Sequence, residues 1–197
     1  MAEATKREAA RPLDAPGERG RARRREAMLR VDHAGEFGAV QIYRGQRAVF
    51  ARAAGKERTR DLIAAMETGE AEHLKTFDAM VRARGVRPTA LAPAWAVAGY
   101  ALGAATALLG EKAAHACTAA VEEVIAAHYA AQAAELANDP IDGDAELRVL
   151  AERFGAEEAG HRATALAEGA EEAPGYALLS AAIKFGCRAA IAISERV

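Results

Sequence analysis

Hydrophobic residues recur every three or four positions along most of the chain, which is the spacing of one face of an α-helix. Prolines and glycines interrupt this pattern and divide it into four long segments. We predict helices from about residue 25 to a break near Gly55, from there to Arg84, from about 111 to 137, and from about 144 to 170. Two apolar segments, residues 88–110 and 175–197, follow the second and the fourth helix.

Each long segment has one line of residues that would face the core of a helical bundle. The four lines are Leu29, His33, Glu36, Val40, Tyr43, Arg47 and Phe50; Ile63, Met66, Glu70, His73, Phe77 and Met80; Thr118, Glu122, Ile125, Tyr129 and Gln132; and Leu147, Ala151, Phe154, Glu158, His161 and Ala165. Every line includes one glutamate. Buried carboxylates are costly, so four that converge on one core need protons, basic partners or metal ions.

Two of these lines carry the motif Glu-x-x-His, at Glu70–His73 and Glu158–His161. The spacing also repeats: Glu36 lies 34 residues before Glu70, and Glu122 lies 36 residues before Glu158. Each midpoint falls at an expected turn, so each helix pair should bring its ligands to one level. Singly, such a glutamate is more often a surface residue and such a histidine a polar core residue. The combination predicts a metal site.

Charge balance favours two metal ions in this site. Four glutamates carry four negative charges, which two divalent cations would neutralise. Carboxylate and imidazole ligands without thiolate suit iron or manganese. A ferritin-like four-helix bundle is the fold that holds this ligand set, and we expect the segment at 88–110 to be its crossover helix and the segment at 175–197 an extra apolar helix.

The composition restricts the class of protein further. Alanine alone accounts for 54 of the 197 residues, and only 5% are aromatic, which excludes an all-β fold. A net charge of −2 argues against nucleic acid as a partner. Cys117 and Cys187 lie too far apart for a Cys-x-x-Cys motif, so a reducing compartment is favoured.

The basic residues gather near the N-terminus. Residues 1–30 contain nine Lys and Arg against five Asp and Glu. We interpret residues 1–25 as a disordered basic arm, either a solvated tail or an electrostatic contact with a membrane, and residues 26–197 as one domain. The acidic residues in the arm weigh against a mitochondrial leader.

At these motifs the chain resembles the di-iron demethoxyubiquinone hydroxylases of ubiquinone biosynthesis. The resemblance runs from Leu29 to Val197. It is carried by Arg30-Val31-Asp32-His33-Ala34-Gly35-Glu36, by Glu70-Ala71-Glu72-His73-Leu74-Lys75, by Ala119-Ala120-Val121-Glu122-Glu123 with His128-Tyr129, by Glu157-Glu158-Ala159-Gly160-His161, and by Gly186-Cys187-Arg188-Ala189-Ala190-Ile191 through Ser194-Glu195-Arg196.

The resemblance implies a set of site residues. The iron ligands would be Glu36, Glu70, His73, Glu122, Glu158 and His161. Between adjoining glutamates, the family pattern selects Glu122 over Glu123, and the Glu-x-x-His spacing itself selects Glu158. Tyr129 and Arg188 would contact substrate or reductant; a core tyrosine and a solvated or lipid-facing arginine are the alternatives.

The implied activity is hydroxylation, with O2, of the ring of a polyprenylated demethoxy-benzoquinol (2-polyprenyl-3-methyl-6-methoxy-1,4-benzoquinol). Two iron ions would be the cofactor. The chain contains neither Gly-x-Gly nor Cys-x-x-Cys, so no flavin, nicotinamide or iron–sulfur domain is recognisable. The resemblance makes NADH the external reductant. A lipid-presenting accessory protein of ubiquinone biosynthesis and a second copy of the chain are candidate partners.

A polyprenyl substrate also makes a membrane surface an expected partner. Residues 88–110 carry no charge, and we favour a packed or in-plane helix there over a membrane span. The segment at 175–197 has a narrow polar side, so it either lies at an interface or buries its apolar face in protein. We expect a peripheral protein on the cytoplasmic face of a bacterial membrane, or on the mitochondrial inner membrane in a eukaryote.

Two other functions fit part of the pattern. A ferritin-like iron store or peroxide scavenger would use the same ligands but would not need the apolar segments. A noncatalytic helical protein of the membrane surface would use those segments but would leave four core-facing glutamates unexplained.

Overall fold

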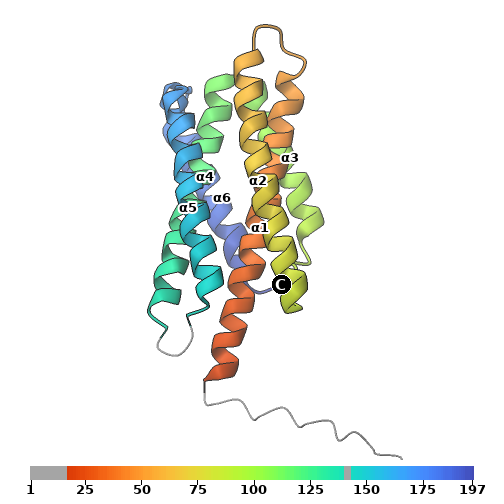
Figure 1. The fold of residues 1–197 in the computed structure, drawn as a ribbon. Helices are drawn as coiled ribbons and strands as arrows, with labels where there is room; N and C mark the ends of the chain where they lie inside the picture. The colour runs from red at the N-terminus through yellow and green to blue at the C-terminus, as the bar shows by residue number, and fades with distance from the viewer. Residues whose placement is uncertain (1–16, 140–142) are drawn as a thin grey trace, which may run out of the picture.

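The computed structural model describes residues 17–139 and 143–197, and these residues confirm the all-α fold (Figure 1). They form six α-helices and one short 3-10 helix: α1 (Glu18–Phe50), α2 (Glu57–Arg84), α3 (Ala92–Leu108), α4 (Glu111–Ala137), α5 (Ala145–Ala167), η1 (Ala170–Glu172) and α6 (Tyr176–Ser194). The four long helices predicted from the sequence are α1, α2, α4 and α5.

These four helices are arranged as two hairpins of a ferritin-like bundle. Helix α1 packs on α2, and α4 packs on α5. Helix α3 is the predicted crossover between the hairpins and lies along α1, while α6 lies against α4 (Figure 1). The turn predicted around Pro140 between α4 and α5 falls largely outside the described residues.

Helix α1 begins at Glu18, earlier than the predicted start near residue 25, so the prediction of a disordered arm is wrong for residues 18–25. Arginine and glutamate have good helix propensity, and they extend the helix here without an apolar stripe. Arg24 also donates hydrogen bonds to Glu135 of α4 and to Glu195 beyond α6, at 2.8 and 2.9 Å. Residues 1–16, the rest of the predicted arm, lie outside the described residues.

Two glycines allow α3 to pack against α1 with close backbone contact. A Cβ atom at Gly103 would lie 1.9 Å from the carbonyl oxygen of Ile42, and one at Gly45 would lie 2.2 Å from the carbonyl oxygen of Tyr100. Any side chain at either position would push the helices apart. Helix α3 is therefore a packed helix, as predicted, although Val97 and Leu108 on it are 72% and 75% exposed.

Helix α6 turns much of its apolar surface outward. Part of its predicted polar side faces the protein instead: Ser180 is buried, and Lys184 donates a 2.6 Å hydrogen bond to Glu123 of α4. Leu178 and Phe185 are 78% and 74% exposed. By length and composition alone, α6 is also the one described helix that could cross a membrane.

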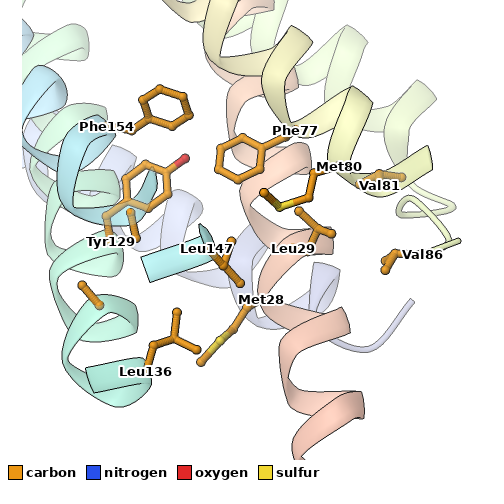
Figure 2. Packing of buried hydrophobic residues seen from close by; sticks show 12 residues of the cluster. Met28, Leu29, Phe77, Met80, Val81, Val86, Tyr129, Leu136, Leu147 and Phe154 are labelled. Atoms are coloured by element: carbon orange, nitrogen blue, oxygen red, sulfur yellow. The ribbon is translucent and has the colours of Figure 1, made fainter. Parts of the chain in front are cut away.

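The predicted core lines are buried almost throughout, except that Arg47 is exposed and pairs with Glu67. Apolar side chains form one cluster towards the start of α1 and another towards its end. In the first cluster, Phe77 of α2, Tyr129 of α4 and Phe154 of α5 lie as neighbouring rings (Figure 2). The second cluster includes Tyr43 and Met66. Polar residues of all four bundle helices lie between the two clusters.

Candidate metal centre

The six residues that the sequence predicts as ligands meet in the core of the bundle. They lie on four helices: Glu36 on α1, Glu70 and His73 on α2, Glu122 on α4, and Glu158 and His161 on α5. All four glutamates are fully buried, His73 is 2% exposed, and the side chain of His161 is 20% exposed. These residues form two groups of four that could each surround a metal ion. One group is Glu36, Glu70, His73 and Glu158, and the other is Glu70, Glu122, Glu158 and His161. Within each group, one ligand atom from each residue lies within 4.8 Å of the others.

Glu70 and Glu158 belong to both groups. Glu158 places Oε1 3.1 Å from Nδ1 of His73 and Oε2 3.3 Å from Nδ1 of His161. Glu70 places Oε2 3.8 Å from Nδ1 of His73 and Oε1 2.9 Å from Nδ1 of His161. Each of these carboxylates therefore directs one oxygen to each group, as a ligand bridging two metal ions would.

Glu36 and Glu122 each belong to one group, and a tyrosine binds each of them. Tyr43 donates a 2.5 Å hydrogen bond to Oε1 of Glu122, and Tyr129 donates a hydrogen bond to Oε1 of Glu36. The second oxygen of Glu36 lies 3.4 Å from Nδ1 of His73. In each of these glutamates, one oxygen thus accepts a hydrogen bond from a tyrosine and the other is the ligand atom of its group.

The remaining ligand atoms are buried without a hydrogen-bond partner among the described residues. They are Oε2 of Glu36 and Glu122, both oxygens of Glu70 and Glu158, and Nδ1 of His73 and His161. Leaving such atoms unpaired in a protein core is costly. Eight of them converge here, four in each group, which is the donor set that two cations of the iron or manganese type would satisfy.

Electrostatics gives the same picture. Burial is the main cause that raises the pKa of three of the glutamates, namely Glu36, Glu70 and Glu122, and repulsion between carboxylates adds to it. Burial acts in the same direction on Glu158, but its close contacts with His161 and His73, at 3.3 and 3.1 Å from Nδ1, outweigh it and lower that pKa to about 2. Burial thus favours the protonated form of Glu36, Glu70 and Glu122, and metal ions would compete with these protons.

Two contacts around the cluster were not predicted. Glu157 places Oε2 2.7 Å from Nε2 of His73, on the side of the ring opposite the metal-facing Nδ1. Tyr43 was placed on a core line without a role. A sequence signal existed for it, because Tyr43 follows Glu36 by the same seven residues that separate Tyr129 from Glu122.

The two residues expected to contact substrate or reductant lie in different surroundings. Tyr129 is 1% exposed and its hydroxyl is bound to Glu36. Arg188 is exposed on α6. The roles that the resemblance implies for them stay predictions.

An apolar pocket of about 520 Å³ lies between α1, α3, α4 and α6. Its wall includes Gly35 and Ala39, on either side of Glu36, and Val121 and Ile125, on either side of Glu122. The pocket is thus lined in part by α1 and α4, which carry Glu36 and Glu122, the two glutamates that belong to only one group.

Fold and site together define a class of protein: a ferritin-like helical bundle whose core brings two Glu-x-x-His motifs and two further glutamates into one carboxylate–histidine cluster. Within this class, the family described as "Ubiquinone biosynthesis protein COQ7" matches residues 23–194, and the chain belongs to that family.

Individual relatives agree with this assignment. The chain is 47% identical over 182 residues to the 3-demethoxyubiquinol 3-hydroxylase of Rhodospirillum rubrum, covering 92% of this chain and 82% of the relative. It is 48% identical over 171 residues to the mitochondrial NADPH-dependent 3-demethoxyubiquinone 3-hydroxylase of Mus musculus, covering 87% and 77%. It is 36% identical over 183 residues to the mitochondrial 5-demethoxyubiquinone hydroxylase of Saccharomyces cerevisiae, covering 87% and 78%. The family resemblance seen in the sequence is confirmed, and the ferritin-like store is not favoured.

Proposed function

We propose that this chain hydroxylates the ring of a polyprenylated demethoxy-benzoquinol with O2 in ubiquinone biosynthesis. One observation carries the proposal: eight buried ligand atoms without a hydrogen-bond partner among the described residues lie in a bundle whose helices α1 and α4 also form part of the wall of an apolar pocket. The names of the relatives, all hydroxylases of demethoxyubiquinone or its quinol, support the same reaction. In this reaction a ring C–H bond becomes C–OH, and two electrons and two protons reduce the second oxygen atom to water.

The proposed cofactor is a pair of iron ions. Glu36 and His73 would hold one ion, Glu122 and His161 the other, and the carboxylates shared by both groups would bridge them. Bound there, the iron pair would supply the activation of O2. The protein itself excludes water, because the four glutamates are fully buried between two apolar clusters.

The apolar pocket would bind the substrate. Its size is within the range of small-molecule sites. Val121 and Ile125 flank Glu122 on the pocket wall, so a ring at this end would lie near the cluster, while the wall between α3 and α6 would receive the prenyl tail. Trp95 of α3 and Ser194 of α6, joined by a 3.2 Å hydrogen bond, are polar groups of the lining.

We propose a membrane surface as the source of this substrate. The outer faces of α3 and α6, which border the pocket, expose Val97, Leu108, Leu178 and Phe185. Apolar helix faces of this kind lie in the interfacial layer of a bilayer. The protein would be peripheral, on the cytoplasmic face of a bacterial membrane or on the mitochondrial inner membrane in a eukaryote. In vesicle flotation, Phe185→Glu should bind less than the wild type, and equal flotation would contradict the proposed surface.

The electrons would come from a reduced nicotinamide outside the chain. The sequence resemblance implies NADH, whereas the mouse relative's name specifies NADPH. Tyr129 and Arg188 remain proposed contacts for substrate or reductant. An accessory lipid-presenting protein and a second copy of the chain remain proposed partners.

The test is anaerobic loading of the full chain with iron, followed by a demethoxyquinol, a reduced nicotinamide and isotopically labelled O2. We expect the hydroxylated quinol with one labelled oxygen, identified by mass. Glu122→Ala should lose the iron of the site with His161 and the product, and Glu123→Ala should keep both irons and the product. A chain that binds two irons but returns the quinol unchanged would refute the proposed reaction.

A further inference from the structure

The two tyrosines beside the cluster are related by an internal repeat of the sequence. Glu122 follows Glu36 by 86 residues, and Tyr129 follows Tyr43 by the same number. On each helix the tyrosine lies seven residues after the glutamate, about two turns later, so the two side chains share one face. Helices α1 and α4 therefore present the same Glu-and-Tyr pattern to the core.

The hydrogen bonds cross between the two helices. Tyr43 of α1 donates to Glu122 of α4, and Tyr129 of α4 donates to Glu36 of α1. The helices run antiparallel, so the glutamate of each lies level with the tyrosine of the other. Both tyrosines are 1% exposed. This leaves each hydroxyl to the carboxylate rather than to solvent.

Each tyrosine makes the two oxygens of its glutamate different. In both Glu36 and Glu122, Oε1 accepts the tyrosine hydroxyl, whereas Oε2 has no hydrogen-bond partner among the described residues. The shared glutamates differ, since neither oxygen of Glu70 or Glu158 has such a partner in the same part of the chain. A hydrogen bond from a donor to one carboxylate oxygen makes that oxygen a weaker metal ligand, which favours binding of a single metal ion through the other oxygen over bridging.

We infer that Tyr43 and Tyr129 are a matched pair of positioning residues, each of which holds the glutamate of the opposite helix as a one-oxygen ligand of one metal ion. Tyr43 serves the site that contains His161, and Tyr129 serves the site that contains His73. The inference rests on the metal centre of the proposed function but not on its substrate. It gives Tyr129 a role at the metal centre in addition to the proposed contact with substrate or reductant.

Manganese binding to the metal-depleted full chain tests this inference. The wild type and the control Tyr100→Phe, a change at a 45% exposed tyrosine, should bind two equivalents tightly. Tyr43→Phe and Tyr129→Phe should each weaken one equivalent by about 10- to 100-fold, as removal of an outer hydrogen bond to a ligand does. If one variant fails to fold, the other tests the same inference at the second site.

A double-mutant cycle separates positioning from a general structural effect. Adding Tyr43→Phe to Glu122→Gln should change the remaining site by less than about twofold, because the partner of Tyr43 is already altered. Adding it to Glu36→Gln should weaken the only site left. Unchanged affinity in both single variants, or weakening by Tyr43→Phe in both backgrounds, would overturn the inference. Two intact manganese sites, in a chain that leaves the quinol unchanged when it is loaded with iron instead, would refute the proposed reaction and leave this inference standing.

Discussion

Replacing a cluster glutamate by glutamine should have one of two outcomes, depending on which glutamate is changed. Glu36 and Glu122 direct one oxygen to one group, whereas Glu70 and Glu158 direct one oxygen to each of two groups. The substitution keeps the size of the side chain and removes its charge. We expect Glu122→Gln to weaken one metal site and Glu70→Gln to weaken both.

The size of the effect follows from the linkage between metal binding and folding. A ligand at 100 times its dissociation constant stabilises the folded state by about 2.7 kcal/mol, so two sites contribute about 5.4 kcal/mol. For a chain of this length, each kcal/mol raises Tm by about 2–4 °C. Metal should therefore raise the Tm of the wild type by about 11–22 °C, that of Glu122→Gln by about half as much, and that of Glu70→Gln very little.

Thermal unfolding with and without manganese, together with the bound metal per chain, is the assay. Glu123→Gln is the matched control, because Glu123 adjoins Glu122 but binds Lys184 and Arg162. Without metal, Glu70→Gln and Glu122→Gln should be at least as stable as the wild type, since each removes one of several mutually repelling carboxylates. Equal loss of metal in the two variants would refute the distinction between shared and singly used ligands.

Three other predictions concern pH, an outer contact and packing. Burial raises the pKa of three cluster glutamates, so metal must displace protons; calorimetry in buffers of different ionisation enthalpy should show proton release, and affinity should fall as the pH is lowered. Glu157→Gln removes the carboxylate partner of His73 and should weaken one manganese site by about 10- to 100-fold, measured by titration. Gly103→Ala places a Cβ against the carbonyl of Ile42 and should cost about 1–3 kcal/mol in chemical denaturation, whereas Gly20→Ala, with open space, should cost nothing.

The sequence was sufficient to predict the four bundle helices and the six cluster residues. Helical spacing defines which residues share a face, and a glutamate on a buried face requires compensation. Both signals lie within single helices or in one repeated interval. The start of α1 was predicted too late because residues 18–25 lack an apolar stripe. Arg24 in this part of the helix binds Glu135 and Glu195, and contacts with residues so distant in sequence cannot be seen in a local pattern.

Contacts between helices were harder to predict. Periodicity shows that Tyr43 faces the core, but not that its hydroxyl reaches a glutamate on another helix. The orientation of α6 was left open, because a helix that is apolar around most of its surface can turn either side to the protein. The pairing of Lys184 with Glu123 settles the orientation, and that contact joins two separate helices.

The internal repeat extends to the histidines, and the place where it breaks makes the two metal sites unequal. His161 follows His73 by 88 residues. Glu157 is the partner of His73, so in a perfect repeat the partner of His161 would lie 88 residues before Glu157. That position is Gly69. A Cβ atom on Gly69 would lie 3.6 Å from Nε2 of His161, so the glycine lies where a carboxylate-bearing residue would be in a perfect repeat.

This difference gives the two histidines different surroundings at the same ring atom. Nε2 of His73 lies 2.7 Å from a carboxylate oxygen, and the side chain is 3% exposed. The side chain of His161 is 20% exposed and has a glycine beside it. A carboxylate that orients a histidine also makes it a more basic metal ligand. The site with His73 should therefore bind its ion more tightly, and the site with His161 should be the one that fills last and empties first.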